Sequence, residues 1–415
     1  MPINKPPTTS IKLTSRERVL KALRHEEADR IPIDFGAMAS TGIMALAYAQ
    51  LKKYLGITTG HVRVFDIGQQ LAEVEPEILD RFGVDVISLE QSLIGEQPGR
   101  WKPWRLPDGT ACQVPAELDI RPDEERGGWL IWENGIPTQR MSDSCLYFES
   151  IDHPLAEAAT SADLREFPRP LISDERLRFL EKRAETLAAN TDYAIMANFG
   201  GSILESGQGL RGWGQFMMDL AGGGAFTEDL IAGIVEWHLQ NLSLYLEAVG
   251  DNVQIIQFGD DLGTQDRPQI SPAMYQQYLK TGHARLFQVV HQNSDCAVFF
   301  HSCGSIKPLI PDLIDAGVDI LNPVQTSAVQ MDPRQLKAEF GDRITFWGGG
   351  CDTQHVLPNA TPDEVAQHVT ERISIFAPGG GFVFNQVHNI QADVPPENII
   401  AMFDTARDFR FTRSK

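Results

Sequence analysis

The chain has 415 residues, of which 42% are hydrophobic and 22% are charged, and its formal net charge at pH 7 is −20. This composition is typical of a globular protein, and one large domain of this length is within the range of α/β barrels. The acidic balance argues against binding to nucleic acid or to anionic membranes, since both carry negative charge. The sequence contains neither a signal-like segment nor an apolar run long enough to cross a bilayer, so we expect a soluble, cytoplasmic protein.

The order of the predicted elements indicates an α/β barrel. Residues 1–11 are polar and are expected to form a flexible N-terminus before a single domain over residues 12–415. Helix starts are predicted by capping-box spacing at Thr14 and by a capping residue before proline at Ser271, Asp332 and Thr361. Eight apolar, β-branched runs alternate with helical stretches: Ile31–Gly36, Val84–Leu89, Tyr193–Phe199, Val253–Phe258, Ala297–His301, Asp319–Gln325, Ile344–Gly348 and Phe382–Asn385. Eight strands that alternate with helices predict a (β/α)8 TIM barrel.

An insertion is predicted between the second and third strands. Residues 101–141 are rich in Trp, Gly and Pro, and turn pairs occur at Asp108 with Gly109 and at Asn134 with Gly135. These signals predict a β-hairpin insertion over about residues 95–160. Because it follows the carboxyl end of a strand, the insertion could form a wall or partial lid over the barrel mouth. A solvated decoration or a dimer contact is an equal alternative.

The sharpest local feature is the end of the fifth predicted strand, where His301 and Cys303 follow an apolar run. Residues two apart in an extended chain point to the same side, so the imidazole and the thiol share a face. Imidazole nitrogen and thiolate sulfur are ligands that Zn2+ favours in proteins. The pair therefore predicts a zinc site.

Two more residues of metal-binding type follow later strands. Cys351 comes after three glycines beyond the seventh predicted strand, and His388 comes just beyond the eighth. Because closure of a barrel brings these strand ends to one mouth, we expect either residue to complete the ligand set. The alternative is that such cysteines are inert buried residues and such histidines only bond a backbone carbonyl. The cysteines expected to be structural are Cys112, Cys145 and Cys296.

Acidic and polar residues near the predicted strand ends are further candidates for the site. The candidates for proton transfer are Asp34, Glu205, Asp260 and Asp261. Adjacent carboxylates such as Asp260 and Asp261 repel each other, so one of them can hold a proton at neutral pH. Capping of a nearby helix is the equal alternative for this pair. The candidates for substrate binding are Phe35, Asn198, Asn322, Gln325 and Trp347.

Four segments carry a resemblance to a known family: Leu13–Leu20, Asp29–Pro32, His301–Gly304 and Val394–Ile399. The chain resembles, over nearly its whole length, the uroporphyrinogen-decarboxylase superfamily, which also contains cobalamin-dependent methyltransferases such as methylcobalamin:coenzyme M methyltransferases. True uroporphyrinogen decarboxylases carry an arginine-rich segment after the first strand that binds the porphyrinogen carboxylates, whereas residues 34–42 contain no arginine here. The resemblance is therefore closer to the methyltransferase branch, whose His-x-Cys pair matches His301 and Cys303.

The resemblance implies a zinc-dependent methyltransferase. Its zinc would be held by His301, Cys303 and either Cys351 or His388, with one position open for a thiol. The thiol would lose its proton and take a methyl group from methylcobalamin or from the corrinoid of a partner protein, or the site would demethylate a small methylated compound. The implied partners are a small-molecule substrate, a corrinoid protein and a second copy of the chain in a homodimer.

Two other functions stay open on the sequence alone. The first is a metal-free decarboxylase or lyase in which Asp34 or Asp260 handles protons. The second is a non-catalytic subunit that binds a corrinoid protein. Zinc content separates the first from methyl transfer, and turnover of a methyl donor separates the second.

Overall fold

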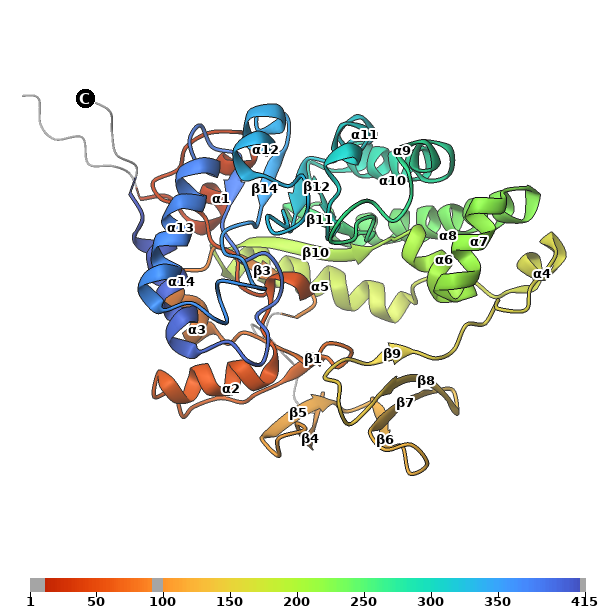
Figure 1. The fold of residues 1–415 in the computed structure, drawn as a ribbon, viewed down its shortest axis with the longest axis horizontal. Coiled ribbons are helices and arrows are strands. Elements are labelled where there is room, and N and C mark those ends of the chain that lie inside the picture. Colours follow the sequence, from red (N-terminus) through yellow and green to blue (C-terminus); the bar gives the residue numbers. More distant parts are fainter. Residues whose placement is uncertain (1–11, 92–99, 411–415) are drawn as a thin grey trace, which may run out of the picture.

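Seven parallel strands form the central sheet in a computed structural model that describes residues 12–91 and 100–410 (Figure 1). Each strand of this sheet pairs in parallel with the strand of the sheet that follows it in the chain. The predicted flexible segment, residues 1–11, lies outside the described residues. The strands are β3 (Val86–Ser88), β10 (Ala194–Gly200), β11 (Ile255–Gly259), β12 (Ala297–His301), β13 (Ile320–Asn322), β14 (Thr345–Trp347) and β15 (Phe382–Val383).

The first predicted strand closes the barrel between β15 and β3. Ile33 pairs in parallel with Phe384, and the Asp85 N–H donates to the Ile33 carbonyl at 2.8 Å. The segment makes single bridges and not a regular ladder, since Pro32 has no N–H to contribute. The TIM barrel expected from the sequence is thus confirmed, with seven regular strands and one irregular closing segment.

Helices follow the strands and cover the outside of the barrel (Figure 1). The capping box predicted at Thr14 is present, and Ser271, Asp332 and Thr361 each cap a helix with the side chain as predicted. The α-helices are α1 (Ser15–Leu23), α2 (Ala45–Tyr54), α3 (Pro76–Phe82), α4 (Ser161–Glu166), α5 (Asp174–Asn190), α6 (Leu204–Arg211), α7 (Trp213–Gly222), α8 (Ala225–Val249), α9 (Pro272–Met274), α10 (Lys280–Asn293), α11 (Ile310–Ala316), α12 (Pro333–Phe340), α13 (Pro362–Phe376) and α14 (Pro396–Asp408). Shorter turns are the 3-10 segments η1 (Ala39–Thr41) and η3 (Lys307–Leu309) and the π segment η2 (Tyr275–Leu279).

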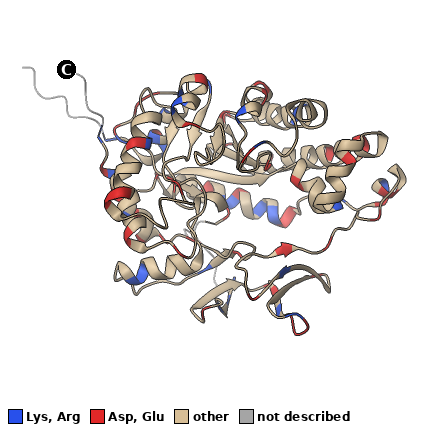
Figure 2. Cartoon of the chain, viewed as in Figure 1, with Lys and Arg blue, Asp and Glu red and all other residues tan. Residues whose placement is uncertain are grey.

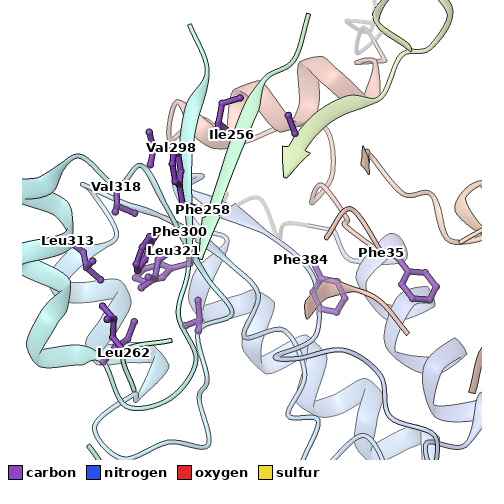
Figure 3. Packing of buried hydrophobic residues seen from close by; sticks show 14 of the residues in the cluster. Phe35, Ile256, Phe258, Leu262, Val298, Phe300, Leu313, Val318, Leu321 and Phe384 are labelled. Atoms are coloured by element: carbon purple, nitrogen blue, oxygen red, sulfur yellow. The ribbon is translucent and has the colours of Figure 1, made fainter. Parts of the chain in front are cut away.

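Alternation along the strands divides the buried residues into two layers. On β12, Phe299 belongs to the cluster inside the barrel, whereas Val298 and Phe300 belong to the cluster between the barrel and its helices. Figure 3 shows Val298 and Phe300 gathered near Leu313 of α11. Because side chains alternate across a strand, His301 has the inward parity of Phe299. The imidazole of His301, the last residue of β12, therefore lies at the barrel mouth.

The insertion after β3 contains two small antiparallel sheets. The predicted turns occur where expected, with Asp108 and Gly109 between β4 and β5, and Asn134 and Gly135 between β7 and β8. The insertion is larger than the single hairpin expected, and Figure 1 draws its strands β4 to β8 as a layer below the barrel. Its strands are β4 (Trp101–Arg105), β5 (Ala111–Pro115), β6 (Asp119–Pro122), β7 (Trp129–Glu133), β8 (Ile136–Met141) and β9 (Glu149–Ser150), and a further short pair, β1 (Val64–Asp66) and β2 (Leu71–Ala72), precedes them.

The chain that leaves the insertion is attached to the barrel at two places. The Tyr147 hydroxyl donates to Gln391 Oε1 at 2.8 Å, in the loop after β15. The Leu155 N–H donates to the Leu210 carbonyl at the end of α6, also at 2.8 Å. This segment thus links the loop after β15 to helix α6, which follows β10.

A buried ion cluster holds the opposite end of the barrel together. Asp85, immediately before β3, is fully buried and accepts from Arg18 at 2.6 Å and from Arg30 at 2.6 Å. Arg18 also binds Asp29 at 2.7 Å, and the Ile33 N–H donates to Asp85 at 2.9 Å. Helix α1, the closing segment and β3 are therefore joined at the amino ends of the strands.

The surface carries the chain's negative charge in a dispersed form. Figure 2 shows Asp and Glu spread over the outer helices and the insertion, with Lys and Arg between them. Within residues 12–91 and 100–410, no helix combines the length and the apolar character that a membrane span requires.

Candidate metal centre

Three side chains with metal-binding atoms converge beyond β11 and β12. His301 is the last residue of β12, Cys303 follows two residues later, and Asp261 lies two residues after β11. Their ligand atoms all lie within 4.8 Å of one another. His301 Nε2 is 3.4 Å from Cys303 Sγ and 3.5 Å from Asp261 Oδ1. The sequence predicted the first two as ligands and Asp261 as a proton-transfer residue.

Two crossing loops hold this group in place. The Cys303 N–H donates to Asp261 Oδ1 at 2.8 Å, and the Leu262 N–H donates to the Ser302 hydroxyl at 2.9 Å. A Cβ at Gly263 would lie 2.4 Å from the Cys303 carbonyl, so the loops can approach this closely only because Gly263 has no side chain. The sequence thus fixes the separation of Asp261 from the strand end that carries His301 and Cys303.

The charge around the three ligand atoms favours a cation. Burial, followed by the charges of Asp261 and Glu205, raises the pKa of the Cys303 thiol. Glu205 is an exposed residue, but its carboxyl lies against the mouth, where desolvation and then the charges of Asp260 and Asp261 raise its pKa to about 8. A positive ion among these groups would offset both effects.

The separations also suit the geometry of zinc. Typical Zn–N, Zn–O and Zn–S lengths place neighbouring donors of a tetrahedron about 3.4–3.6 Å apart. The separations of 3.4 and 3.5 Å from His301 Nε2 are close to two of those tetrahedral edges, and the third pair of ligand atoms lies within 4.8 Å. The nitrogen, sulfur and oxygen donors present therefore fit Zn2+, and three protein ligands leave a fourth position for a substrate.

Two polar residues expected to bind substrate contact the strand end and loops around the candidate ligands. Asn322 is fully buried, and its Oδ1 lies 2.6 Å from His301 Nδ1. Gln325 accepts from the Gly304 N–H at 2.8 Å and donates to Gln265 Oε1 at 2.8 Å. Both side chains therefore act in this structure on residues at or next to the candidate ligands.

Cys351 and His388 do not join the group of three. Cys351 is fully buried in the cluster outside the barrel, and burial raises the pKa of its thiol. His388 is partly accessible; burial and then the charge of His301 lower the pKa of His388 to about 4. The influence of His301 and Asp261 on this pKa places His388 near the same mouth. The choice between Cys351 and His388 as a further ligand stays a prediction, with His388 the better placed.

Asp260 acts as a helix cap in this structure. It is fully buried and accepts from the Ile203 N–H at 3.0 Å, the Leu204 N–H at 2.8 Å and the Glu205 N–H at 2.9 Å. These are the unpaired donors at the start of α6, which a carboxylate satisfies well. The capping alternative raised for this residue therefore describes its contacts, and the cap also orients Glu205 toward Asp261.

The chain matches the model of one known protein family. Residues 164–409 match the model of the family described as uroporphyrinogen decarboxylase (URO-D). The chain belongs to this family. The matched range contains six of the seven barrel strands and all three residues of the candidate metal centre.

Two curated relatives of the URO-D family match a short part of the chain. Uroporphyrinogen decarboxylase from Psychromonas ingrahamii is 35% identical over 86 residues, or 21% of this chain and 22% of that protein. The enzyme of the same name from Pseudoalteromonas atlantica is 32% identical over 79 residues, or 19% of this chain and 21% of that protein. The chain thus aligns with about a fifth of the length of these curated relatives.

A solved structure extends the likeness to nearly the whole chain. A methyltransferase from Methanosarcina mazei has a TM-score of 0.56 and 17% identity, with 95% of this chain and 98% of that chain covered. At this identity the likeness concerns the fold. It supports the barrel assignment for residues outside the range matched by the URO-D family as well.

The remaining predicted site residues of this URO-D member lie in or beside the core. Phe35 packs against Phe403 with ring centroids 4.5 Å apart, and Figure 3 shows it near Phe384. Trp347 is fully buried inside the barrel. Asn198 donates to the Ala37 carbonyl at 3.1 Å, and its Oδ1 has no hydrogen-bond partner in the part of the chain described. Phe35 and Trp347 thus have no access to solvent here, whereas Asn198 keeps a free acceptor.

Asp34 is expected to make the free energy of unfolding of this URO-D member depend on pH. It is fully buried and accepts from Trp347 Nε1 at 2.9 Å and from the Ala37 N–H at 3.0 Å. Burial raises the pKa of Asp34 from 3.8 to about 6, despite these hydrogen bonds. As pH rises from about 4 to 6, the unfolded chain loses this proton first, so the free energy of unfolding falls by about 2 kcal/mol.

We expect Asp34→Asn to remove this dependence. Between pH 4 and pH 7, the unfolding free energy of wild type should fall relative to that of Asp34→Asn by about 2 kcal/mol. Urea unfolding at several pH values measures this difference. Asp295→Asn, at an exposed aspartate, is the control. Parallel pH profiles for wild type and Asp34→Asn would contradict the expected titration.

Proposed function

We propose that the protein is a zinc-dependent methyltransferase that moves a methyl group between a corrinoid and a thiol or another small acceptor. The observation that carries this proposal is the convergence of His301 Nε2, Cys303 Sγ and Asp261 Oδ1 within 4.8 Å. The same fold carries methyl transfer in the methyltransferase from Methanosarcina mazei, so the barrel of this chain is compatible with that class of reaction. The corrinoid is methylcobalamin itself or the prosthetic group of a partner protein.

The proposed zinc site would be held by His301, Cys303 and Asp261. Zinc bound there would lower the pKa of an acceptor thiol entering the open position. Glu205 lies in the first turn of α6, and desolvation and then the charges of Asp260 and Asp261 act on its carboxyl and raise its pKa. It is therefore the residue placed to take the proton that the thiol releases.

The bond changes of the proposed reaction balance without a further reagent. The thiol transfers its proton to Glu205, and its sulfur forms a bond to the methyl carbon of the methylcorrinoid. The bond between that carbon and cobalt breaks, and its electron pair stays with the corrinoid. The roles of the chain are to hold the acceptor sulfur, accept the proton and limit water at the mouth.

A metal-free decarboxylase is the second candidate. It is favoured by the names of the URO-D relatives and by Asp34, a buried carboxyl whose pKa is raised to about 6. Against a porphyrinogen substrate stand residues 34–42, which offer no arginine, and the acidic character of the chain, whose formal net charge is −20 and whose Asp261 lies at the mouth. A substrate with many carboxylates would meet like charge there.

Metal analysis and a transfer assay test the proposal together. Protein purified without added zinc is expected to hold about one zinc per chain, as a single site requires. With that protein, methylcobalamin and a small thiol should give loss of the methylcobalamin absorbance and formation of a methyl thioether. Chelation of the zinc should stop the reaction, and its return should restore it.

Three results would contradict the proposal in different ways. Absence of zinc together with carbon dioxide release from a carboxylated substrate would favour the decarboxylase. Binding of a corrinoid protein without turnover of any methyl donor would indicate a docking subunit. Methyl transfer that persists after complete removal of zinc would show that the metal is not part of the reaction.

A further inference from the structure

Asn322 has an amide orientation that its neighbours determine. Its Nδ2 donates to the Trp347 carbonyl at 2.8 Å, an atom that can only accept. Its Oδ1 accepts from the Ser40 hydroxyl at 2.9 Å and lies 2.6 Å from His301 Nδ1. The amide oxygen of Asn322 therefore faces the imidazole.

This orientation decides where His301 carries its hydrogen. An amide oxygen has no hydrogen to donate, so His301 Nδ1 must be the donor in the 2.6 Å contact. In a neutral imidazole the other nitrogen, Nε2, then carries a lone pair. That nitrogen is the one that lies 3.4 Å from Cys303 Sγ and 3.5 Å from Asp261 Oδ1.

We propose that Asn322 is a positioning residue that holds His301 in the Nδ1–H form, with Nε2 directed at the cation site. This inference rests on the proposed zinc function but concerns a residue outside the ligand set. Asn322 and Ser40 are both buried, so water does not compete for the amide oxygen. A second partner that fixes the imidazole ring raises metal affinity, because the ligand atom is already in place.

Three neighbouring parts of the barrel contribute to this arrangement. Asn322 ends β13, which pairs with β12 so that His301 and Asn322 are direct neighbours in the sheet. Trp347 ends β14, and Ser40 belongs to η1, the turn after the closing segment. The Asn322 amide that faces the imidazole is thus fixed by the Trp347 carbonyl and by the Ser40 hydroxyl. A side chain that only filled space would not need this set of directed bonds.

The first test measures the tautomer of His301 in metal-free protein. In protein labelled with nitrogen-15 at histidine, the imidazole signals of His301 are identified by their loss in His301→Ala. At mildly alkaline pH, wild type should show the Nδ1–H form, and Asn322→Leu should show a mixture or the Nε2–H form. Asn322→Asp keeps an acceptor and should retain the Nδ1–H form. A wild-type protein in the Nε2–H form would overturn the inference.

The second test measures zinc affinity by competition with a chromogenic chelator. Asn322→Leu should bind zinc about 10- to 100-fold more weakly than wild type, and Asn322→Asp should bind within a few-fold of it. Asn398→Leu is the matched control, since Asn398 is also buried but bonds the Leu357 and Ala360 carbonyls. Its affinity should equal that of wild type.

The outcomes separate this inference from the proposed function. Wild type that binds no zinc overturns the zinc proposal, while the tautomer measurement still decides the orientation of His301. Wild type that binds zinc no more tightly than Asn322→Leu overturns only the positioning role of Asn322. Should Asn322→Leu fail to fold, Ser40→Ala takes its place, with an expected weakening of a few-fold.

Discussion

Replacing His301 and Cys303 together with alanine is expected to lower zinc affinity by about 10⁴-fold or more. Zinc bound by four ligands in a protein contributes roughly 10–16 kcal/mol, or about 3 kcal/mol per ligand, and two ligands are removed. Asp261 would remain, but a single carboxylate near water holds zinc weakly. Chelator competition measures the affinity, and methyl transfer from methylcobalamin should become undetectable.

A matched double variant controls for the loss of a histidine and a cysteine. His291→Ala with Cys145→Ala removes the same side chains from the outer surface and from the insertion, where neither contacts the candidate metal centre. This control should keep the zinc affinity and activity of wild type. Equal zinc binding by wild type and the His301→Ala, Cys303→Ala variant would place the metal elsewhere in the chain.

The local part of the candidate site could be predicted from the sequence. The apolar run before His301 indicates a strand, and residues two apart in a strand share a face, so His301 and Cys303 were expected together. Asp261 lies about one βα unit earlier, and its approach depends on Gly263 and on the bond from the Cys303 N–H. No local pattern specifies how closely two loops cross.

Cys351 illustrates the limit of strand-end reasoning. The strand ends do meet at one mouth, as the pairing of β13, β14 and β15 requires. The direction of a side chain in the following loop depends on that loop's own path, and Cys351 is directed into the outer core. Ser40 was missed for a related reason, because nothing in its loop indicates that its hydroxyl meets Asn322.

The fold was predictable to a greater extent than the site. Helix caps and β-branched runs are local signals, and they gave the order of strands and helices correctly. The closing segment at Ile33 was expected as a full strand, but Pro32 interrupts its ladder. The second sheet of the insertion consists of the four strands β6 to β9. The turn residues in the sequence indicated a hairpin there, but they did not indicate how many strands would pair.

The two ends of the barrel have different tasks. The segments Leu13–Leu20 and Asp29–Pro32, which carry the family resemblance, supply Arg18 and Arg30 to the buried cluster around Asp85. This cluster lies at the amino ends of the strands, whereas the candidate metal centre lies at the carboxyl ends. In TIM barrels the first end commonly serves stability and the second serves chemistry. Family-like residues at the first end therefore indicate the scaffold and not the reaction.

Asp85→Ala is expected to lower the free energy of unfolding by about 3–5 kcal/mol, because it removes the buried carboxylate that pairs with two arginines and leaves Arg18 with Asp29 alone. Asp85 is fully buried and is the carboxylate that joins Arg18 to Arg30. The matched control is Asp404→Ala, which also removes an aspartate between two arginines, Arg81 and Arg407, but at a partly exposed site. It should cost at most about 1 kcal/mol. Urea unfolding of both variants measures the difference, and equal losses would mean that the buried cluster contributes no more than a surface ion pair.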